Sequence, residues 1–400
     1  MSVADTQERE GVAARGVWEV RVADDLEEAS LRKTTEFLRR FTPAGVDPVW
    51  SVDYFKWKLG ERNPAGRGLL TCAVAGGDVV GVTSLTPKRI WFRRTMLIGA
   101  EIGDTYTHPD FLRASTHREG SPPIAHGHST DHRTSEYLSR SIFGRLVSDT
   151  RARAIDRGMR LIYGTPNQLS RPGYEKRLNF RSHPTHHNQT FVRPTAQGVL
   201  GRYRRLRRVS WMLHRGEQMF GALTRALTVI QAGGRYALAR LERSSGELDE
   251  LWDRLKGQRE FSLVRDRLYF QHRFFDHPLA NYVVHTASRD GRIHGVMVTR
   301  VMKTGLGKRY CGIADWLVDA SHARLFPLLL AHVIRAHDRE PLDGFQLWCA
   351  PQGGERLMLH RLGFIRVGEA PIIFFQNAEG HDVLHTCPSL DFTLASSDNI

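Results

Sequence analysis

Apolar and polar positions along the chain follow a strand-and-helix order that recurs in its second half. Apolar runs of strand length predict strands over residues 18–22, 69–76, 79–92, 96–107 and 185–194. Helical spacing predicts an amphipathic helix over 26–41, a longer helix after Tyr137, and a short helix that ends near Phe180. A strand joins these last two helices. The pattern indicates a mixed α/β (α+β) unit.

The second half repeats these elements in the same order. Residues 269–273 (YFQHR) match 54–58 (YFKWK), and the hairpin at 281–301 matches the one at 69–86. Likewise GIADWLVD at 312–319 matches EIGDTYTH at 101–108, and HRLGFIRV at 360–367 matches EKRLNFRS at 175–182. Ordered matches of this kind predict a tandem duplication. Pro327 falls where the second copy's long helix is expected to run, so we expect that helix to be disturbed.

The segment between the two copies is Arg-rich and has apolar residues at helical spacing, with Gly233-Gly234 as a break. It predicts one or two helices, either packed across the two domains or lying on an anionic membrane surface. The expected organisation is a disordered tail (1–16), a first domain (17–196, with a loop insertion at about 110–136), a basic helical linker (197–246), and a second domain (247–400).

Composition narrows the class of protein. Of 400 residues, 41% are hydrophobic and 25% charged, which is typical of a soluble globular protein of two domains. No run is long enough to span a bilayer, and the polar start has no signal-peptide core. Four scattered cysteines predict free thiols and a cytoplasmic location. The net charge of +14 suits an anionic ligand. No nucleic-acid-binding motif accompanies this charge, so we expect the protein not to bind nucleic acid.

One stretch, from Ile98 to Phe180, has the most specific pattern. It reads as a strand ending at Pro109, a polar insertion, a loop of small residues, a helix, a strand, and then TPNQLSRPGYEKRLNF. With the insertion set aside, this order resembles the core of the GNAT superfamily of acyl-CoA N-acyltransferases. That resemblance implies two tandem GNAT-like domains, each a mixed, mostly antiparallel twisted sheet flanked by helices.

The resemblance also implies an acyl-CoA site in the first copy. Its diphosphate loop corresponds to Leu138–Phe143, where Ser139, Arg140, Ser141, Ile142 and Phe143 would surround the phosphates, although Ser replaces both usual glycines and Leu138 the usual Arg. An ordinary helix N-cap is the alternative role for these serines. The strand segment with Tyr106 and Thr107 would meet the thioester carbonyl, and Asn167 would bind the pantetheine arm or simply form a turn.

The catalytic candidates are an acid and a base. The resemblance implies that Tyr174 protonates the departing thiolate, and packing beside Phe180 is its alternative role. Glu101 and Asp104 are the candidate bases, and we expect them to point to opposite faces of their strand because they are three positions apart, an odd spacing. A chain of water molecules is the alternative route for the proton.

Histidines crowd the insertion (His117, His126, His128 and His132) and follow the short helix (His183, His186 and His187). Neither group has the spacing of a structural zinc site, so no metal is predicted. We therefore expect an N-acetyltransferase that uses acetyl-CoA and a small-molecule amine such as an amino sugar, with a degenerate second copy. The alternatives are a Fem-like transferase that uses aminoacyl-tRNA and a non-catalytic acyl-CoA-binding scaffold.

Overall fold

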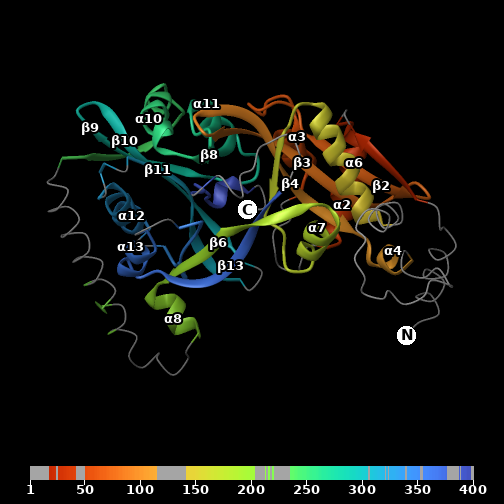
Figure 1. The fold of residues 1–400 in the computed structure, drawn as a ribbon. Coiled ribbons are helices and arrows are strands. Elements are labelled where there is room, and N and C mark those ends of the chain that lie inside the picture. The colour runs from red at the N-terminus through yellow and green to blue at the C-terminus, as the bar shows by residue number, and fades with distance from the viewer. Residues whose placement is uncertain are drawn as a thin grey trace.

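The computed structural model describes most of the chain (Figure 1). The described residues are 18–23, 26–41, 50–114, 141–202, 235–304, 307–319, 321–322, 324–337, 340–351, 355–375, 387 and 389–397, together with 212, 215, 216 and 219. The predicted tail and most of the insertion and of the basic linker lie outside these residues. Among them, no helix combines the length and apolarity needed to cross a membrane.

The first half places helices on both faces of a sheet. Its strands are β1 (Glu19–Ala23), β2 (Leu69–Ala75), β3 (Asp78–Phe92), β4 (Thr95–Thr107), β5 (Leu161–Gly164) and β6 (Phe180–Pro194). Its helices are α2 (Glu28–Arg39), α3 (Val52–Leu59), α4 (Pro109–Ala114), α6 (Ile142–Asp156), α7 (Arg171–Arg177) and α8 (Ala196–Arg202). Helices α2 and α3 pack on one face through Leu31, Leu38 and Phe55, and α6 packs on the other through Val147 and Ala154.

The second half has the same order. Its strands are β7 (Ala237–Leu241), β8 (Phe261–Leu263), β9 (Val283–Arg289), β10 (Arg292–Lys303), β11 (Arg309–Val318), β12 (Gly344–Cys349) and β13 (Ile365–Phe375). Its helices are α10 (Glu247–Leu255), α11 (Arg267–Phe270), α12 (Leu325–Ala336) and α13 (Glu355–Arg361), with single turns η2 (Lys256–Gln258), η3 (Gln271–Phe275) and η4 (Leu394–Ser396).

Backbone details match between the halves. Tight turns with positive φ join β2 to β3 at Gly76-Gly77 and β9 to β10 at Asp290-Gly291. Two glycines also correspond: a Cβ on Gly81 would lie 2.7 Å from Cγ2 of Ile142 at the start of α6, and one on Gly295 would meet Leu325 at the start of α12. Because both helices begin against the same point of their sheets, the predicted duplication is confirmed by the structure.

The two halves form one sheet by exchanging their last strands. The described strands make a 13-stranded sheet in the order β1-β2-β3-β4-β5-β13-β6-β12-β11-β10-β9-β7, with β8 pairing β3. Thus β13 from the second half pairs with β5 of the first, while β6 from the first half pairs with β12 of the second. Figure 1 shows β6 and β13 side by side at the middle of the molecule.

A reciprocal contact joins the halves at equivalent residues. The Trp57 and His272 rings stack with centroids 4.9 Å apart and an interplanar angle of 9°. Trp57 Nε1 donates to the His272 carbonyl at 2.8 Å, and His272 Nε2 lies 3.0 Å from the Trp57 carbonyl. The predicted match between segments 54–58 and 269–273 is therefore expressed as a local two-fold relation.

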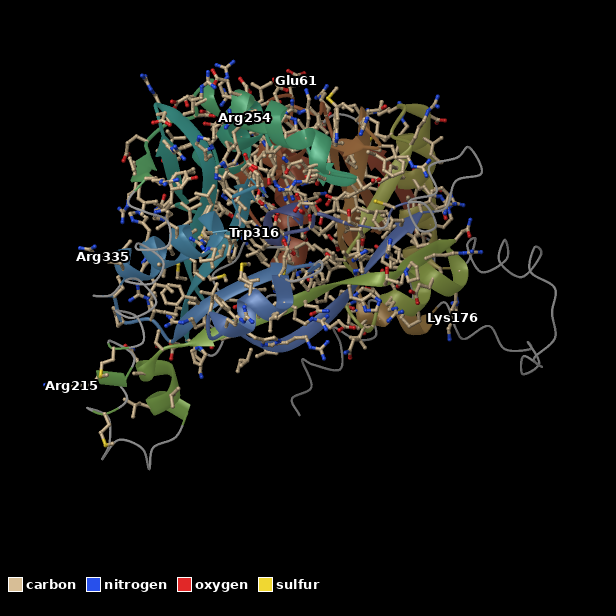
Figure 2. The ribbon with its side chains drawn as sticks, turned by 60° about the vertical axis from the view of Figure 1, so that its left-hand side comes forward. Glu61, Lys176, Arg215, Arg254, Trp316 and Arg335 are labelled. Carbon is tan, nitrogen blue, oxygen red and sulfur yellow. The ribbon has the colours of Figure 1, made fainter. Side chains whose placement is uncertain are left out.

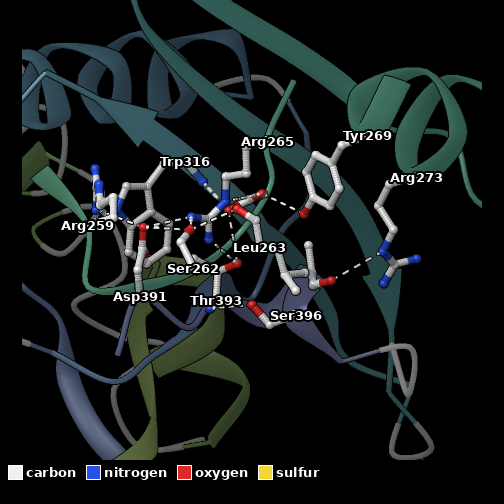
Figure 3. A network of polar contacts seen from close by, with 12 residues as sticks. Arg259, Ser262, Leu263, Arg265, Tyr269, Arg273, Trp316, Asp391, Thr393 and Ser396 are labelled. Carbon is white, nitrogen blue, oxygen red and sulfur yellow. Dashed lines mark hydrogen bonds and ion pairs between the residues drawn. The ribbon is translucent and has the colours of Figure 1, made fainter. Parts of the chain in front are cut away.

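A buried ionic network fastens the C-terminal segment 389–397 to the second half (Figure 3). The Arg265 guanidinium is fully buried and contacts Asp315 (3.0 Å) and Asp391 (2.7 Å). Burial alone would lower the pKa of Arg265, but the two carboxylates raise it. Tyr269 donates its hydroxyl to Asp315 at 2.8 Å, and Thr393 does so at 2.9 Å. Each charge in this network therefore lies against an opposite charge, as a buried ionic group requires.

Two predictions about the second half are wrong. The residues Ala237–Leu241 form strand β7, not a helix, because they pair antiparallel with the edge of β9. Ala, Leu and Arg are strong helix formers, but intrinsic propensity is a small energy per residue and pairing with the sheet edge overrides it. Pro327 does not disturb α12, because the helix begins at Leu325 and the amides of its first turn have no intrahelical acceptor, so the missing N–H of Pro327 costs no hydrogen bond. The four cysteines are buried and free, as predicted.

Candidate functional site

The first half contains an opening between two neighbouring parallel strands. Strand β4 pairs with β5 only from Gly99 to Glu101, opposite Leu161 to Tyr163. Strand β5 ends at Gly164, and its other edge pairs with β13, where Gly164 lies opposite Ile373. The β4 segment 102–107 therefore keeps its pairing with β3 but has no β5 partner, which leaves an edge of backbone groups that a bound ligand can use.

Helix α6 begins beside this opening. Its first residue, Ile142, lies against Gly81, which pairs with Thr107 at the end of β4. Ser141 is the N-cap: its hydroxyl accepts from the Gly144 amide at 3.3 Å, and its side chain is buried. The first turn contains no acidic residue, so the positive end of the helix dipole is not offset by a carboxylate.

Tyr174 on α7 closes the other side of the opening. Its ring lies edge-on to Phe143 and to Phe180, each with centroids 5.1 Å apart, and its hydroxyl is 2.9 Å from Thr105 Oγ1 on β4. Burial raises the pKa of Tyr174 to about 12, against the opposing effect of the Thr105 hydrogen bond. The phenol therefore stays protonated across the physiological range and keeps a proton to give.

The two candidate bases share one face of the sheet, so the prediction that they point to opposite faces is wrong. Asp104 has a φ of 47° in a bulge, where it and Thr105 both lie opposite Thr83. The extra residue resets the alternation of side chains along β4. Both carboxylates consequently meet lysines that line the same cavity on the α3 side, Lys88 at 3.5 Å from Glu101 and Lys58 at 2.6 Å from Asp104.

Asp104 is held by three donors. Besides Lys58 Nζ, it accepts from Ser84 Oγ at 2.8 Å and from Trp50 Nε1 at 3.2 Å. The Lys58 and Asp104 side chains are 1% and 2% exposed. With its oxygens engaged in this way, Asp104 fastens α3 to β4. Glu101 is equally buried, but it lies at the last residue where β4 still pairs with β5.

A cavity of about 40 Å³ lies on this face, between the two halves. Trp57, Lys88 and Arg89 of the first half line it, together with His272 and Arg273 of the second half. Arg89 forms a two-pronged ion pair with Asp266 at 2.6 and 2.7 Å, so an ion pair between the halves forms part of the wall. Thr86 also lines the cavity, and its buried hydroxyl has no hydrogen-bond partner among the described residues.

The remaining predicted site residues are placed as follows. Tyr106 points to the α2–α3 face, where its ring stacks on Phe41 at 5.7 Å and burial raises its pKa. The Thr107 hydroxyl is buried and has no hydrogen-bond partner among the described residues.

Asn167 is exposed and forms the turn before α7, accepting from the Leu169 and Ser170 amides at 3.0 and 2.9 Å. Ser139, Arg140 and the insertion histidines lie outside the described residues.

The later histidines form a small cluster of their own. His183 and His186 have ring centroids 4.8 Å apart, while His187 is 2.7 Å from Glu369. Burial, followed by the neighbouring His186, lowers the pKa of His183. Of these contacts, His187 with Glu369 joins β6 to β13, and none of them involves the residues at the opening.

The sequence did not identify the residues that contact Tyr174, Asp104 and Glu101 in the structure. Thr105 was not singled out, and neither were Lys58 and Lys88. The only sequence signal was the match of YFKWK with YFQHR, which marks the segment containing Lys58 but not the carboxylate it meets. Thr105 gives no signal, because it reaches Tyr174 only through the bulge at Asp104.

The fold of this chain resembles those of solved structures. No protein-family model matches the sequence, and no curated protein matches it. Solved structures do match: a GCN5-related N-acetyltransferase from Anabaena variabilis has a TM-score of 0.53 at 10% identity, covering 89% of this chain and 72% of that one. The chain has the tandem GNAT fold.

Two further matches have the same tandem GNAT fold. N-myristoyltransferase from Saccharomyces cerevisiae, solved with bound myristoyl-CoA, has a TM-score of 0.53 at 12% identity, covering 90% of this chain and 82% of that one. A probable N-acyltransferase from Enterococcus faecalis has a TM-score of 0.52 at 12% identity, with coverages of 90% and 72%. The predicted fold class is therefore confirmed over nine-tenths of the chain.

Within this GNAT fold the two halves differ at the opening. Asn179 and Gly363 both have positive φ after their short helices, which aligns Tyr174 with Met358. By the same matching, Trp316 corresponds to Thr105, since the buried Asp104 and Asp315 are equivalent. The second half therefore has neither the phenol nor the hydroxyl that meet across the opening of the first half.

Proposed function

We propose that this protein is an N-acetyltransferase that moves an acetyl group from acetyl-CoA to a primary amine of a small molecule, such as an amino sugar. The observation that carries the proposal is the bridge from Tyr174 to Thr105 across the opening between β4 and β5, with the start of α6 beside it. Among the described residues, an unpaired strand edge, a helix N-terminus and a protonated phenol meet in the first half and not in the second.

The donor would lie along the free edge of β4. Its diphosphate would lie at the start of α6, where backbone amides and the helix dipole favour negative charge. Ser141, Ile142 and Phe143 supply that turn, and Ser139 and Arg140 precede it in sequence. Asn167, next to α7, would meet the pantetheine arm. The backbone of Tyr106 and Thr107 on β4 would meet the thioester.

The reaction would be a direct transfer. The amine nitrogen attacks the thioester carbonyl carbon, forming a C–N bond and a tetrahedral oxyanion, and collapse of this intermediate breaks the C–S bond. Tyr174 donates its phenolic proton to the departing sulfur. The proton lost by the nitrogen passes to Glu101, directly or through water. Asp104, with its three donors, keeps α3 and the bulge in place and is the weaker candidate for the base.

The acceptor would approach from the face opposite α6. The cavity beside Glu101 lies there, and the second half forms one of its walls through His272 and Arg273. Lys88 and Arg89 each face a carboxylate, so these cations do not simply repel an amine. We propose that the second copy shapes this acceptor side and binds no donor itself. The free buried cysteines support a reducing, cytoplasmic location.

Calorimetric titration with acetyl-CoA tests the donor site. Ser141→Asp keeps an N-cap but places a negative charge beside the diphosphate, whereas Ser141→Asn keeps the cap without that charge. We expect the Asp variant to bind at least about tenfold more weakly, and the Asn variant to bind within about threefold of the parent protein. Equal affinity in all three proteins would place the donor elsewhere.

Turnover is tested separately, as CoA release with a panel of primary amines that includes amino sugars. Binding followed by turnover supports the transferase. Tight binding without turnover on any amine would indicate the non-catalytic scaffold. No binding of acetyl-CoA by the parent protein would contradict the proposal and favour the aminoacyl-tRNA alternative.

A further inference from the structure

Three metal-binding side chains converge in the second half, where sequence spacing predicted no metal. His294 lies on β10, Asp319 follows the end of β11, and His322 precedes α12. Their potential ligand atoms all lie within 4.8 Å of one another, and His322 Nε2 is 4.0 Å from Asp319 Oδ2. Two nitrogens and one carboxylate oxygen are a donor set typical of zinc sites with an open coordination position.

Each ligand is oriented by a neighbour. Tyr236 Oη lies 2.8 Å from His322 Nδ1, which leaves Nε2 of that ring turned toward Asp319. Asp319 Oδ1 accepts from the amide and the hydroxyl of Ser321, at 3.0 and 2.6 Å, so Oδ2 is the oxygen that faces His322. Such contacts to the atom that does not bind the metal are the usual outer shell of a histidine–carboxylate metal site.

His294 completes the set. Its Nδ1 is buried and has no hydrogen-bond partner among the described residues. Its ring centroid is 5.1 Å from that of His322, and Tyr236 lies edge-on to both rings. His294 therefore presents a buried ring nitrogen without a hydrogen bond in the same cluster as the ligand atoms of Asp319 and His322.

The three residues lie at a position of the second half that is equivalent to the proposed diphosphate site of the first half. The Asp319 amide donates to the His294 carbonyl at 3.2 Å, and in the first half the His108 amide donates to the Val80 carbonyl at 2.8 Å. Because these bonds are equivalent, the cluster lies beside the start of α12, at the counterpart of the proposed diphosphate site beside α6. Val80 provides no ligand at the position of His294, so the three-ligand set is specific to the second half.

We propose that His294, Asp319 and His322 bind one Zn²⁺ ion, which holds the segment entering α12 against β10 and β11. Zinc ligands at about 2.0–2.1 Å in tetrahedral geometry are roughly 3.4 Å apart, so small side-chain rotations bring the three atoms to binding distance. The ion would fasten the second copy at the point where the first copy would bind its diphosphate. This proposal is independent of the transferase reaction.

The test uses the full-length protein, stripped of metal by chelation and titrated calorimetrically with Zn²⁺. Cobalt substitution is monitored in parallel by visible absorption, which reports the geometry and the nitrogen and oxygen ligands. We expect one site that raises the thermal midpoint when filled. Asp319→Asn and His322→Gln should each weaken binding by about tenfold or more, and Tyr236→Phe, which removes only an outer contact, by about tenfold. His360→Gln, in the same half but outside the cluster, should bind like the parent.

Zinc bound elsewhere, at the insertion histidines or at cysteines, would be unaffected by these substitutions. Equal affinity in the parent and in the Asp319 and His322 variants would therefore overturn the proposal, as would no binding by the parent. Far-ultraviolet circular dichroism of the metal-free variants checks their folding. If a ligand variant is unfolded, the cobalt spectrum of the parent and the Tyr236→Phe comparison still decide the outcome.

Discussion

At the scale of single residues, the contact between Tyr174 and Thr105 is the most informative in the molecule. A buried phenol that packs between two aromatic rings needs a hydrogen-bond partner, and Thr105 supplies one from the neighbouring strand. The contact spans the opening where β4 and β5 part. The Tyr174 hydroxyl thus forms the hydrogen bond that its burial requires, and in the proposed reaction it is the proton donor.

Substitution of Tyr174 by Phe separates these two roles. The ring contacts with Phe143 and Phe180 remain, so we expect an unchanged fold and acetyl-CoA affinity within about threefold, but kcat lowered roughly 100-fold. Thr105→Val removes the same hydrogen bond and keeps the phenol, and should lower kcat less than tenfold by the same reasoning. Equal losses in both variants would indicate that the hydrogen bond, not the proton, matters.

The pH dependence provides a second check on Tyr174. Since its pKa is raised to about 12 from an ordinary value of 10.0, the folded protein retains this proton at a pH where the unfolded chain loses it. Its contribution to stability is fully present below about pH 10 and is lost as pH rises toward 12. We therefore expect kcat to show no alkaline decline below about pH 10, measured with buffers of constant ionic strength. A decline centred near pH 8 would assign the acid to another group.

Glu101 is tested by removal of its charge alone. Glu101→Gln is nearly isosteric, so acetyl-CoA should still bind while kcat falls about 100-fold or more if this carboxylate accepts the amine's proton. Glu175→Gln is the matched control, because Glu175 follows Tyr174 in sequence but pairs with Arg171 on its own helix. Full activity of the Glu101 variant would leave a water chain as the route for the proton.

At the scale of elements, a single bulge determines the geometry of the site. Without the extra residue at Asp104, regular alternation would direct its carboxylate to the α6 face, away from Lys58. With it, the Asp104–Lys58 pair joins α3 to β4 under almost complete exclusion of water. Buried pairs of this kind contribute little over an apolar substitute, but removal of one partner leaves an uncompensated charge.

This argument predicts strong coupling between Lys58 and Asp104. Lys58→Met and Asp104→Asn should each lower the free energy of unfolding by about 3–5 kcal/mol, measured by urea denaturation. Asn suits the positive φ of this position, so backbone strain does not confuse the comparison. The double variant should be much less destabilised than the sum of the two single variants. Additive losses would show that the pair acts through separate contacts.

At the scale of the whole molecule, the strand exchange makes the two halves one folding unit. Strand β13 lies between β5 and β6, and its Phe374 packs against Tyr163 of the first half and Phe261 of the second. Figure 2 shows side chains filling the space between the halves, with Trp316 near the middle and Arg335 at the outer surface. Neither half holds a complete sheet by itself.

Removal of β13 should therefore affect the distant donor site. A chain that ends after Leu362 retains every proposed site residue, yet it lacks β13, the common partner of β5 and β6, and also segment 389–397, which contacts Arg265. We expect loss of acetyl-CoA binding and of cooperative unfolding, both measured on the purified protein. Phe374→Ala, which keeps the strand but removes a buried ring, should cost about 3–5 kcal/mol of stability and still bind. A truncated protein that binds acetyl-CoA normally would show that the first half keeps its donor site without β13.

The sequence alone determined the elements and their duplication. Apolar spacing located nearly all strands and helices, because the side chains that face the core recur with the period of each element. The structure of two short segments was predicted wrongly, because contacts outside the segment or its position in the helix decide it. Strand β7 forms through pairing with β9, which local preference does not encode, and Pro327 is tolerated because α12 begins two residues before it.

Only the tertiary structure decided which residues meet. The sequence named Tyr174, Glu101 and Asp104, but not the bulge that brings both carboxylates to one face, nor Thr105, Lys58 and Lys88 as their partners. His294 and His322 are 28 positions apart and were not linked by any spacing rule, yet equivalent hairpins and turns place them together. Such contacts depend on strand register and on exchange between the halves. These are properties of the whole sheet, so no local pattern in the chain specifies them.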